Sequence, residues 1–296
     1  MKYLVTGGVG FVGTNLIKRL LNDGHDVISV DNYSTGLRDN EREGCRYYNY
    51  DLSSKHTLGI YVDHGTYPVW RDDNYDVIFH LAALARIQPS IKNPHNTILN
   101  NFVSTLNILE YAKTKNIRFV YAGSSSFHHG LYSSPYAWSK YSGEELCKLY
   151  SSVYDLNTSI CRFYNVYGPY QLEEGDYSTV LGIFEKQYRE GKSLTITADG
   201  EQRRDFTHVD DIVDGLIKCS EHKFNAEFFE LGSGINFSIN EVADMFGKDY
   251  PREYLPVRKG EYERTLCDYS RTELKLGWKP TRSLKDYIKA VINDKS

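Results

Sequence analysis

A glycine-rich turn near the start of the chain constrains the fold more than any other feature. The apolar run 3–5 leads into Gly8, Gly10 and Gly13, which have the spacing G-x-G-x-x-G. Residues 13–22 follow, with apolar side chains at helical spacing. A strand, a tight turn and a helix in this order direct backbone N–H groups and the helix N-terminus toward phosphate groups. The turn therefore predicts a dinucleotide site at the start of a βαβ unit.

Short apolar runs and amphipathic segments alternate beyond this turn. We expect strands at residues 3–5, 27–30, 77–81, 119–121 and 158–164, and helices at residues 13–22, 101–113 and 139–153. This alternation predicts an α/β fold with a doubly wound parallel Rossmann sheet. The connections after Gly168 are longer and contain several prolines, which indicates a smaller C-terminal substrate-binding lobe. The expected division gives 1–168 to the Rossmann domain, to which 205–235 return, and 169–204 with 236–296 to the lobe.

Composition excludes several other classes of protein. The net charge of the 296 residues is −4, and no Lys/Arg block is longer than a pair, so a nucleic-acid partner is not expected. No apolar run reaches the roughly 18 residues of a membrane span, and no signal peptide is expected. The five cysteines lie far apart without a C-x-x-C pair, which favours a reducing cytoplasm over a disulfide framework or zinc site. The adjacent His128 and His129 lack further ligands, so no metal is expected.

An acidic residue at the end of the second expected strand narrows the choice of dinucleotide. Asp31 follows the apolar run 27–30. A carboxylate there can accept hydrogen bonds from both ribose hydroxyls and would repel a 2′-phosphate. We therefore expect NAD rather than NADP.

A tyrosine and a lysine at helical spacing indicate what the cofactor could do. Tyr136 and Lys140 are four residues apart after Pro135, a residue suited to the first turn of a helix. A nearby ammonium stabilises a phenolate, so we expect Lys140 to lower the pKa of Tyr136 and make it an acid–base group. Ser124 and Ser125 directly follow an expected strand, at the edge where such sheets bind ligands. Either hydroxyl could hydrogen-bond the reacting oxygen.

With these elements the chain resembles the extended short-chain dehydrogenase/reductase family. The resemblance is to the NAD-dependent nucleotide-sugar epimerases and dehydratases, especially UDP-glucose 4-epimerase-like members. Residues 6–13 match the turn TGGxGFxG, 30–36 match DNxSxG, and 80–83 match HxAA. The resemblance implies these NAD-binding residues: Gly7, Gly10, Phe11, Val12, Gly13, Asp31, Asn32, Ser34, Gly36, Asp51, Leu52, Leu81, Ala82, Ala83, Asn101, Tyr136 and Lys140.

The resemblance continues into the second half of the chain. Residues 162–169 are similar to RxxNVYGP, 202–211 to QxRDFxxVxD, and 256–261 to PxRxGD. Arg204 would bind the substrate pyrophosphate, since an arginine fork suits phosphate. The implied substrate residues are Ser125, Asn165, Val180, Arg204, Arg258 and Glu261.

The resemblance implies a 4-epimerase that oxidises the sugar to a transient 4-keto intermediate with tightly bound NAD. Tyr136 would move the proton, Ser124 would steady the oxygen and Lys140 would hold the ribose. The substrate would be a UDP-hexose or a UDP-N-acetylhexosamine, and the enzyme would be a homodimer joined through the helices at 101–113 and 139–153. A nucleotide-sugar C4 dehydrogenase/reductase and a non-catalytic NAD-binding module are the alternatives.

Two departures from the family pattern bear on the substrate. Ser125 and Ser126 stand where dehydratases carry an acidic pair, which favours epimerisation or simple C4 oxidation. The loop between Ser124 and Tyr136 is about half the usual length.

Thr265 stands where some members have a larger tyrosine, and we hypothesise that it leaves room for an N-acetylated sugar.

Overall fold

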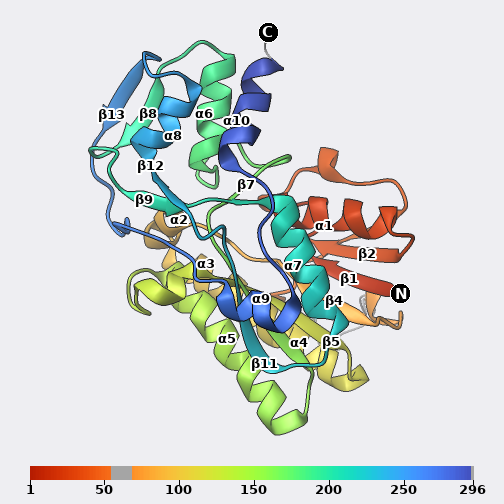
Figure 1. The fold of residues 1–296 in the computed structure, drawn as a ribbon. Coiled ribbons are helices and arrows are strands. Elements are labelled where there is room, and N and C mark those ends of the chain that lie inside the picture. The colour runs from red at the N-terminus through yellow and green to blue at the C-terminus, as the bar shows by residue number, and fades with distance from the viewer. Residues whose placement is uncertain (55–68, 295–296) are drawn as a thin grey trace.

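A seven-stranded parallel sheet forms the centre of the molecule (Figure 1). The computed structural model describes residues 1–54 and 69–294. In sheet order the strands are β11 (Asn225–Leu231), β6 (Thr158–Phe163), β5 (Arg118–Ser124), β4 (Val77–His80), β1 (Lys2–Thr6), β2 (Asp26–Asp31) and β3 (Cys45–Asn49). The order reverses between β1 and β4, and ligands bind such sheets beyond the carboxyl ends of the strands at this point.

Helices cover both faces of the sheet. The main ones are α1 (Phe11–Asn22) and α7 (Val209–Glu221) on one face, and α4 (Ser104–Lys115) and α5 (Pro135–Tyr154) on the other. Successive side chains of β1 point to opposite faces, so Leu4 packs with the α4–α5 side and Val5 with the α1–α7 side. The expected doubly wound α/β fold is confirmed.

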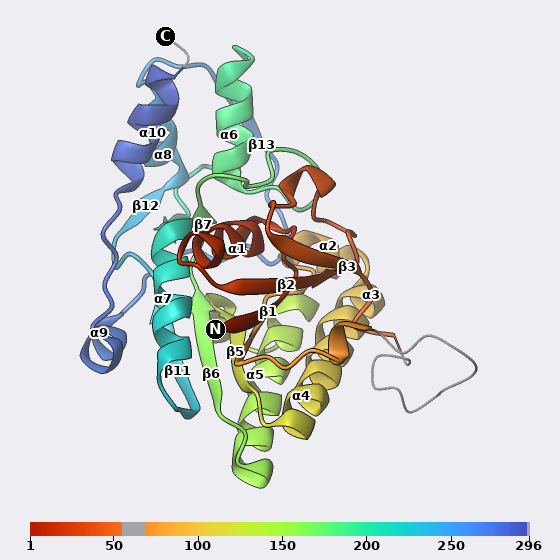
Figure 2. The same ribbon diagram turned by 90° about the vertical axis from the view of Figure 1, so that its right-hand side faces the viewer.

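A third apolar cluster forms the core of a smaller lobe beside the carboxyl ends of the sheet (Figure 2). Its members include Phe184, Leu194, Val242 and Ile288. They come from α6 (Val180–Arg189), β8 (Leu194–Thr197), α8 (Ile239–Phe246) and α10 (Leu284–Asn293). The other strands of this part are β7 (Val166–Tyr167), β9 (Arg203–Asp205), β10 (Thr207–His208), β12 (Asn236–Ser238) and β13 (Arg252–Leu255).

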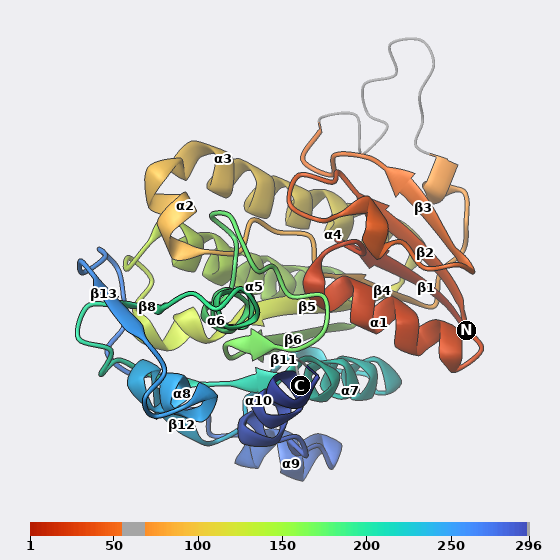
Figure 3. The same cartoon turned by 90° about the horizontal axis from the view of Figure 1, so that it is seen from above.

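Several short elements complete the structure, and Figure 3 shows α2 and α3 beside α5. They are η1 (Arg38–Asn40), η2 (Val69–Arg71), α2 (Ile87–Lys92), α3 (Pro94–Ile98), η3 (Leu99–Val103), η4 (Ser125–His129) and α9 (Ser270–Leu276). The helix expected from residue 101 instead starts as α4 at Ser104, and the π-helical turn η3 precedes it. In the described chain no helix is long and apolar enough to cross a membrane.

Candidate active site

The glycine turn lies against the neighbouring loop so closely that side chains are excluded from it. Gly7 has a φ of +74°, and a Cβ there would lie 2.8 Å from the backbone nitrogen of Ala82. A Cβ on Gly13 would lie 2.2 Å from the carbonyl oxygen of Gly7. The turn therefore presents bare backbone at the start of α1, as close approach to a pyrophosphate requires.

A cleft at the carboxyl ends of β1, β2 and β4 collects most of the expected cofactor residues. Those that line it are Gly7, Gly10, Asp31, Asn32, Ser34, Asp51, Leu52, Leu81, Ala82 and Ala83. Phe11, Val12, Gly13, Gly36, Asn101, Tyr136 and Lys140 are not among its lining residues. The sequence interpretation did not include Val30, Thr35, Tyr50, Leu84, Asn100 and Ser104, which also line the cleft. Most of these are neighbours of motif residues, so chain proximity was the available signal.

The Asp31 carboxylate is fixed at the edge of this cleft by backbone donors. Its Oδ1 accepts from the Tyr33 N–H at 2.8 Å and its Oδ2 from the Val9 N–H at 3.1 Å. Burial raises the pKa of Asp31, and the backbone N–H groups partly oppose that shift. Each oxygen keeps a lone pair that can accept from a ribose hydroxyl. The glycine turn, the cleft and this carboxylate together fit a bound dinucleotide.

Tyr136 and Ser124 meet in the structure although twelve residues separate them. Tyr136 lies in the first turn of α5, which begins after Ser134, whose Oγ caps the Ala137 N–H at 3.1 Å. The Ser124 hydroxyl lies close enough to the Tyr136 phenol to lower its pKa. Ser125, the other candidate, is half-buried and opens η4. The geometry thus favours Ser124 as the partner of Tyr136.

The electrostatics around Tyr136 differ from the sequence expectation. Burial raises the pKa of Tyr136, while the Ser124 hydroxyl and the charge of Arg86 act to lower it. Lys140 is not among the groups that shift the pKa of Tyr136, and its ammonium donates to the carbonyl of Ala122 at 2.8 Å. Burial lowers the pKa of Lys140 to about 8. The sequence analysis did not single out Arg86. The available signal was a charged residue directly after the apolar run 81–85.

Asn101 ties α5 to the cofactor cleft. Its Oδ1 accepts from the N–H of Leu84, a cleft residue, at 2.7 Å, and its Nδ2 donates to the Ser139 hydroxyl of α5 at 2.9 Å. The π-helical turn η3 carries Asn101, and such turns are frequent at functional sites. Asn101 therefore positions the segment that contains Tyr136 relative to the cleft.

The expected substrate residues form bonds among themselves. Arg204 pairs with Glu261 through Nη2 and Oε2 at 3.0 Å, and burial lowers the pKa of this arginine. The Asn165 amide donates to the Asp205 carbonyl at 2.9 Å and to the Thr265 hydroxyl at 3.2 Å. Thr265 is buried, and its hydroxyl orients Asn165 by accepting this hydrogen bond.

Two other expected substrate residues lie apart from this group. Arg258 is exposed and takes no part in the Arg204–Glu261 ion pair. Val180 is the first residue of α6, after the capping hydroxyl of Thr179, and packs against the core of the smaller lobe.

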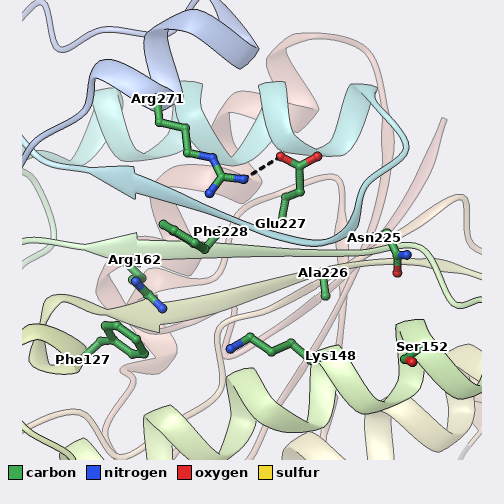
Figure 4. A pocket seen from close by; sticks show the side chains of 9 residues that line it. All are labelled: Phe127, Lys148, Ser152, Arg162, Asn225, Ala226, Glu227, Phe228 and Arg271. Atoms are coloured by element: carbon green, nitrogen blue, oxygen red, sulfur yellow. Dashed lines mark hydrogen bonds and ion pairs between the residues drawn. The ribbon is translucent and has the colours of Figure 1, made fainter.

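A buried ion network supports the loop that follows Ser124. Arg162 bonds to Glu144 and Glu230, and its Cζ lies 3.4 Å from the ring centroid of Phe127. His128 Nε2 lies 2.9 Å from Glu230 Oε1. Figure 4 shows Arg162 between Phe127 and Phe228. These side chains line a pocket of about 470 Å³ at the outer edge of the sheet. The charge of Arg162 is balanced by Glu144 and Glu230 within the protein. We therefore interpret this region as a support for the loop after Ser124.

Over the described ranges, no group of three or more His, Cys, Asp or Glu side chains is placed to hold a metal ion. His128 is bonded to Glu230, and the His129 ring stacks on Tyr262 with 4.0 Å between centroids. Both histidines therefore fix the short loop in place.

Comparison with known proteins identifies the family of the chain. The NAD-dependent epimerase/dehydratase family matches residues 3–232. A putative UDP-glucose 4-epimerase of Methanocaldococcus jannaschii is 32% identical over 98% of this chain and 97% of that protein. A UDP-glucuronate 4-epimerase of Thermodesulfobacterium geofontis is 34% identical over 98% of this chain and 95% of that protein. The solved UDP-glucose 4-epimerase of Thermotoga maritima with UDP-glucose has a TM-score of 0.90 at 28% identity, covering 99% of this chain and 98% of that chain.

Proposed function

The chain belongs to the NAD-dependent epimerase/dehydratase family, and we propose that it is a UDP-sugar 4-epimerase that works with tightly bound NAD. The closeness of the partly buried Tyr136 phenol to the Ser124 hydroxyl carries this proposal. It brings a hydroxyl to an acid–base group in the first turn of α5, the helix that Asn101 ties to the cofactor cleft. Relatives named for UDP-glucose and for UDP-glucuronate support the nucleotide-sugar substrate.

Tyr136 is proposed to take the proton of the sugar C4 hydroxyl and to return it to the keto oxygen. Bound NAD supplies an acceptor, and then a donor, of the hydride at C4. The Ser124 hydroxyl hydrogen-bonds the same oxygen. Asn165 and Arg204 hold the nucleotide, so that the 4-keto sugar can turn over between the two transfers. The step conserves electrons and protons, and the only net change is the configuration at C4.

The residues after Ser124 separate this proposal from dehydration. Ser125 and Ser126 carry no carboxyl group that could expel water from the sugar. A C4 dehydrogenase/reductase would release NADH, whereas an epimerase needs no added cofactor. A non-catalytic binding module would turn over no sugar.

The proposal is tested with protein as purified and with Tyr136→Phe. Wild-type protein should interconvert the C4 epimers of a UDP-sugar without added NAD and without net NADH. Tyr136→Phe should lower kcat by about 10²-fold or more, because the acid–base group is lost. Tyr254→Phe is the control, since Tyr254 is an exposed residue of the smaller lobe. Unchanged turnover in Tyr136→Phe, with NAD still bound, would contradict the catalytic role.

The same assay tests the hypothesis about Thr265. UDP-N-acetylglucosamine belongs in the substrate panel because the small threonine predicts that this sugar is accepted. Turnover of UDP-glucose with rejection of UDP-N-acetylglucosamine would contradict it.

We further propose a homodimer and a cytoplasmic location. All five cysteines are free thiols, in keeping with a reducing compartment. The dimer would form through α4 and α5, as the family resemblance implies.

A further inference from the structure

Arg86 lies at the junction of four segments that surround Tyr136. It directly precedes α2, and Ile87, the next residue, is packed by the 258–262 segment: a Cβ on Gly260 would lie 3.1 Å from Ile87 Cγ2 and 3.8 Å from the Ser133 carbonyl oxygen. Ser133 lies just before α5 and its Tyr136. The fourth segment, 175–179, leads into α6. The site of the sugar is expected at this junction, between Tyr136 and the Arg204–Glu261 pair.

Two backbone carbonyls fix the guanidinium of Arg86. Its Nε donates to the carbonyl oxygens of Tyr177 at 3.1 Å and of Ser178 at 3.2 Å. The two terminal nitrogens form no hydrogen bond with any residue that the structure describes. The fork of the arginine is thus oriented by its inner nitrogen, and its outer nitrogens remain as donors.

Arg86 has no carboxylate partner in the described chain, because the nearby acids are paired elsewhere. Asp176 lies 3.3 Å from Lys92 Nζ, and Glu261 lies 3.0 Å from Arg204 Nη2. The side chain of Arg86 is only partly buried, and this burial lowers its pKa. A guanidinium that is held in place without a counter-charge and keeps free donors can bind an anionic ligand. Such groups cluster at binding sites.

We propose that Arg86 determines specificity by binding a carboxylate on the sugar, so that the preferred substrate is a UDP-hexuronic acid. This inference rests on the proposed function and deepens it. A planar guanidinium matches a carboxylate with two parallel hydrogen bonds, whereas the hydroxymethyl group of a neutral hexose offers neither the charge nor the second acceptor. Arg204 and Arg258 serve the pyrophosphate in this scheme, which leaves Arg86 for the sugar.

The experiment compares kcat/KM for UDP-glucuronate and UDP-glucose in NAD-loaded wild type, Arg86→Met and Arg86→Lys. Wild type should prefer UDP-glucuronate. Arg86→Met should lose about 10- to 100-fold on UDP-glucuronate, the size of a charged hydrogen-bonded contact, and far less on UDP-glucose. Arg86→Lys should recover part of the loss, because it keeps the charge without the fork. Arg118→Met is the matched control, since Arg118 bonds to the Ser220 carbonyl at the opposite end of the sheet.

Three results separate this inference from the proposed function. Turnover of UDP-glucose with rejection of UDP-glucuronate by wild type would overturn the role of Arg86 and leave the epimerase. Equal losses on both substrates in Arg86→Met, with a shifted alkaline limb of the pH profile, would show that Arg86 acts on Tyr136 and would overturn the inference. Absence of epimerisation with every UDP-sugar would overturn the proposed function itself. Retained NAD shows in each case that the variant is folded.

Discussion

Burial shifts two titratable groups of the candidate site in opposite directions. It raises the pKa of the Tyr136 phenol and lowers that of the Lys140 ammonium to about 8. Both shifts favour the neutral form, because a group withdrawn from water loses the hydration of its charge. The site therefore holds its acid–base group protonated in the protein alone. A positive charge brought by a ligand would favour the phenolate.

The lowered pKa of Lys140 predicts a pH-dependent stability. Below pH 8 the folded protein carries a buried ammonium that the unfolded chain exposes to water, so folding bears a cost. Between pH 8 and 10.5 the folded state releases the proton before the unfolded chain does, and the cost disappears as the pH rises. The difference between 10.5 and about 8 corresponds to about 3 kcal/mol. Lys140→Met should therefore unfold at a higher temperature than wild type at pH 7, with a gap that narrows toward pH 10.

Thermal unfolding of the two proteins at pH 7 and pH 10 checks this. Lys148→Met, on the outer part of the same helix, is the control and should show no such pH dependence, since Lys148 forms a surface pair with Glu145. A gap between Lys140→Met and wild type that stays constant from pH 7 to pH 10 would contradict the assigned shift.

At the scale of single elements, η4 depends on residues far away in the sequence. Glu230 of β11 bonds to His128 of η4 and to Arg162 of β6. Burial alone would raise the pKa of Glu230, but the bonds from His128 and Arg162 bring it below its usual value. The side chain of Arg162 is almost fully buried. Glu230 therefore supplies part of the charge that this arginine needs.

Glu230→Gln should destabilise the protein by about 3 kcal/mol, because it leaves Arg162 buried with less counter-charge. It should also lower kcat while NAD content stays unchanged, since η4 follows Ser124 directly. Thermal unfolding and steady-state kinetics measure the two effects. Glu227→Gln on the same strand is the control, since Glu227 pairs with Arg271 in a partly exposed position, and should cost less than about 1 kcal/mol. Equal effects of the two substitutions would show that η4 needs no anchor at Glu230.

The sequence predicted the elements whose patterns are local. Apolar periodicity predicts five strands of the main sheet and helices α1, α4 and α5, but neither β11 nor α7. The glycine turn follows from spacing alone. The sequence did not predict β3, because this edge strand carries Arg46, Tyr47 and Tyr48 and lacks an apolar run. The helix expected at 101–113 is present, but periodicity does not show that its start forms the π-helical turn η3, in which Asn101 bonds to Leu84 and Ser139.

Local sequence patterns do not predict contacts between residues that are far apart in the sequence. The four-residue spacing of Tyr136 and Lys140 predicts an electrostatic pair. Lys140 instead bonds to the carbonyl of Ala122 on β5, which periodicity cannot show. Arg86 acts on Tyr136 across fifty residues of sequence. The Arg204–Glu261 pair likewise joins segments whose proximity only the smaller lobe creates.

At the scale of the whole molecule, α4 and α5 lie side by side on one face of the sheet. On α5, Leu149 is 50% exposed and Val153 is 58% exposed. They are four residues apart and therefore lie on one face of the helix. Exposed apolar residues aligned in this way favour an interface with a second copy.

The double substitution Leu149→Glu/Val153→Glu should convert the expected homodimer into a monomer, because it places four carboxylates in a two-fold interface where like charges repel. Light scattering coupled to size-exclusion chromatography should give twice the mass of one chain for wild type and the mass of one chain for the variant. Leu274→Glu is the control, since Leu274 is 85% exposed on α9, away from α4 and α5, and should leave the mass unchanged. A wild-type monomer at micromolar concentration would contradict the dimer, and a dimeric double variant would exclude this face of α5 as its interface.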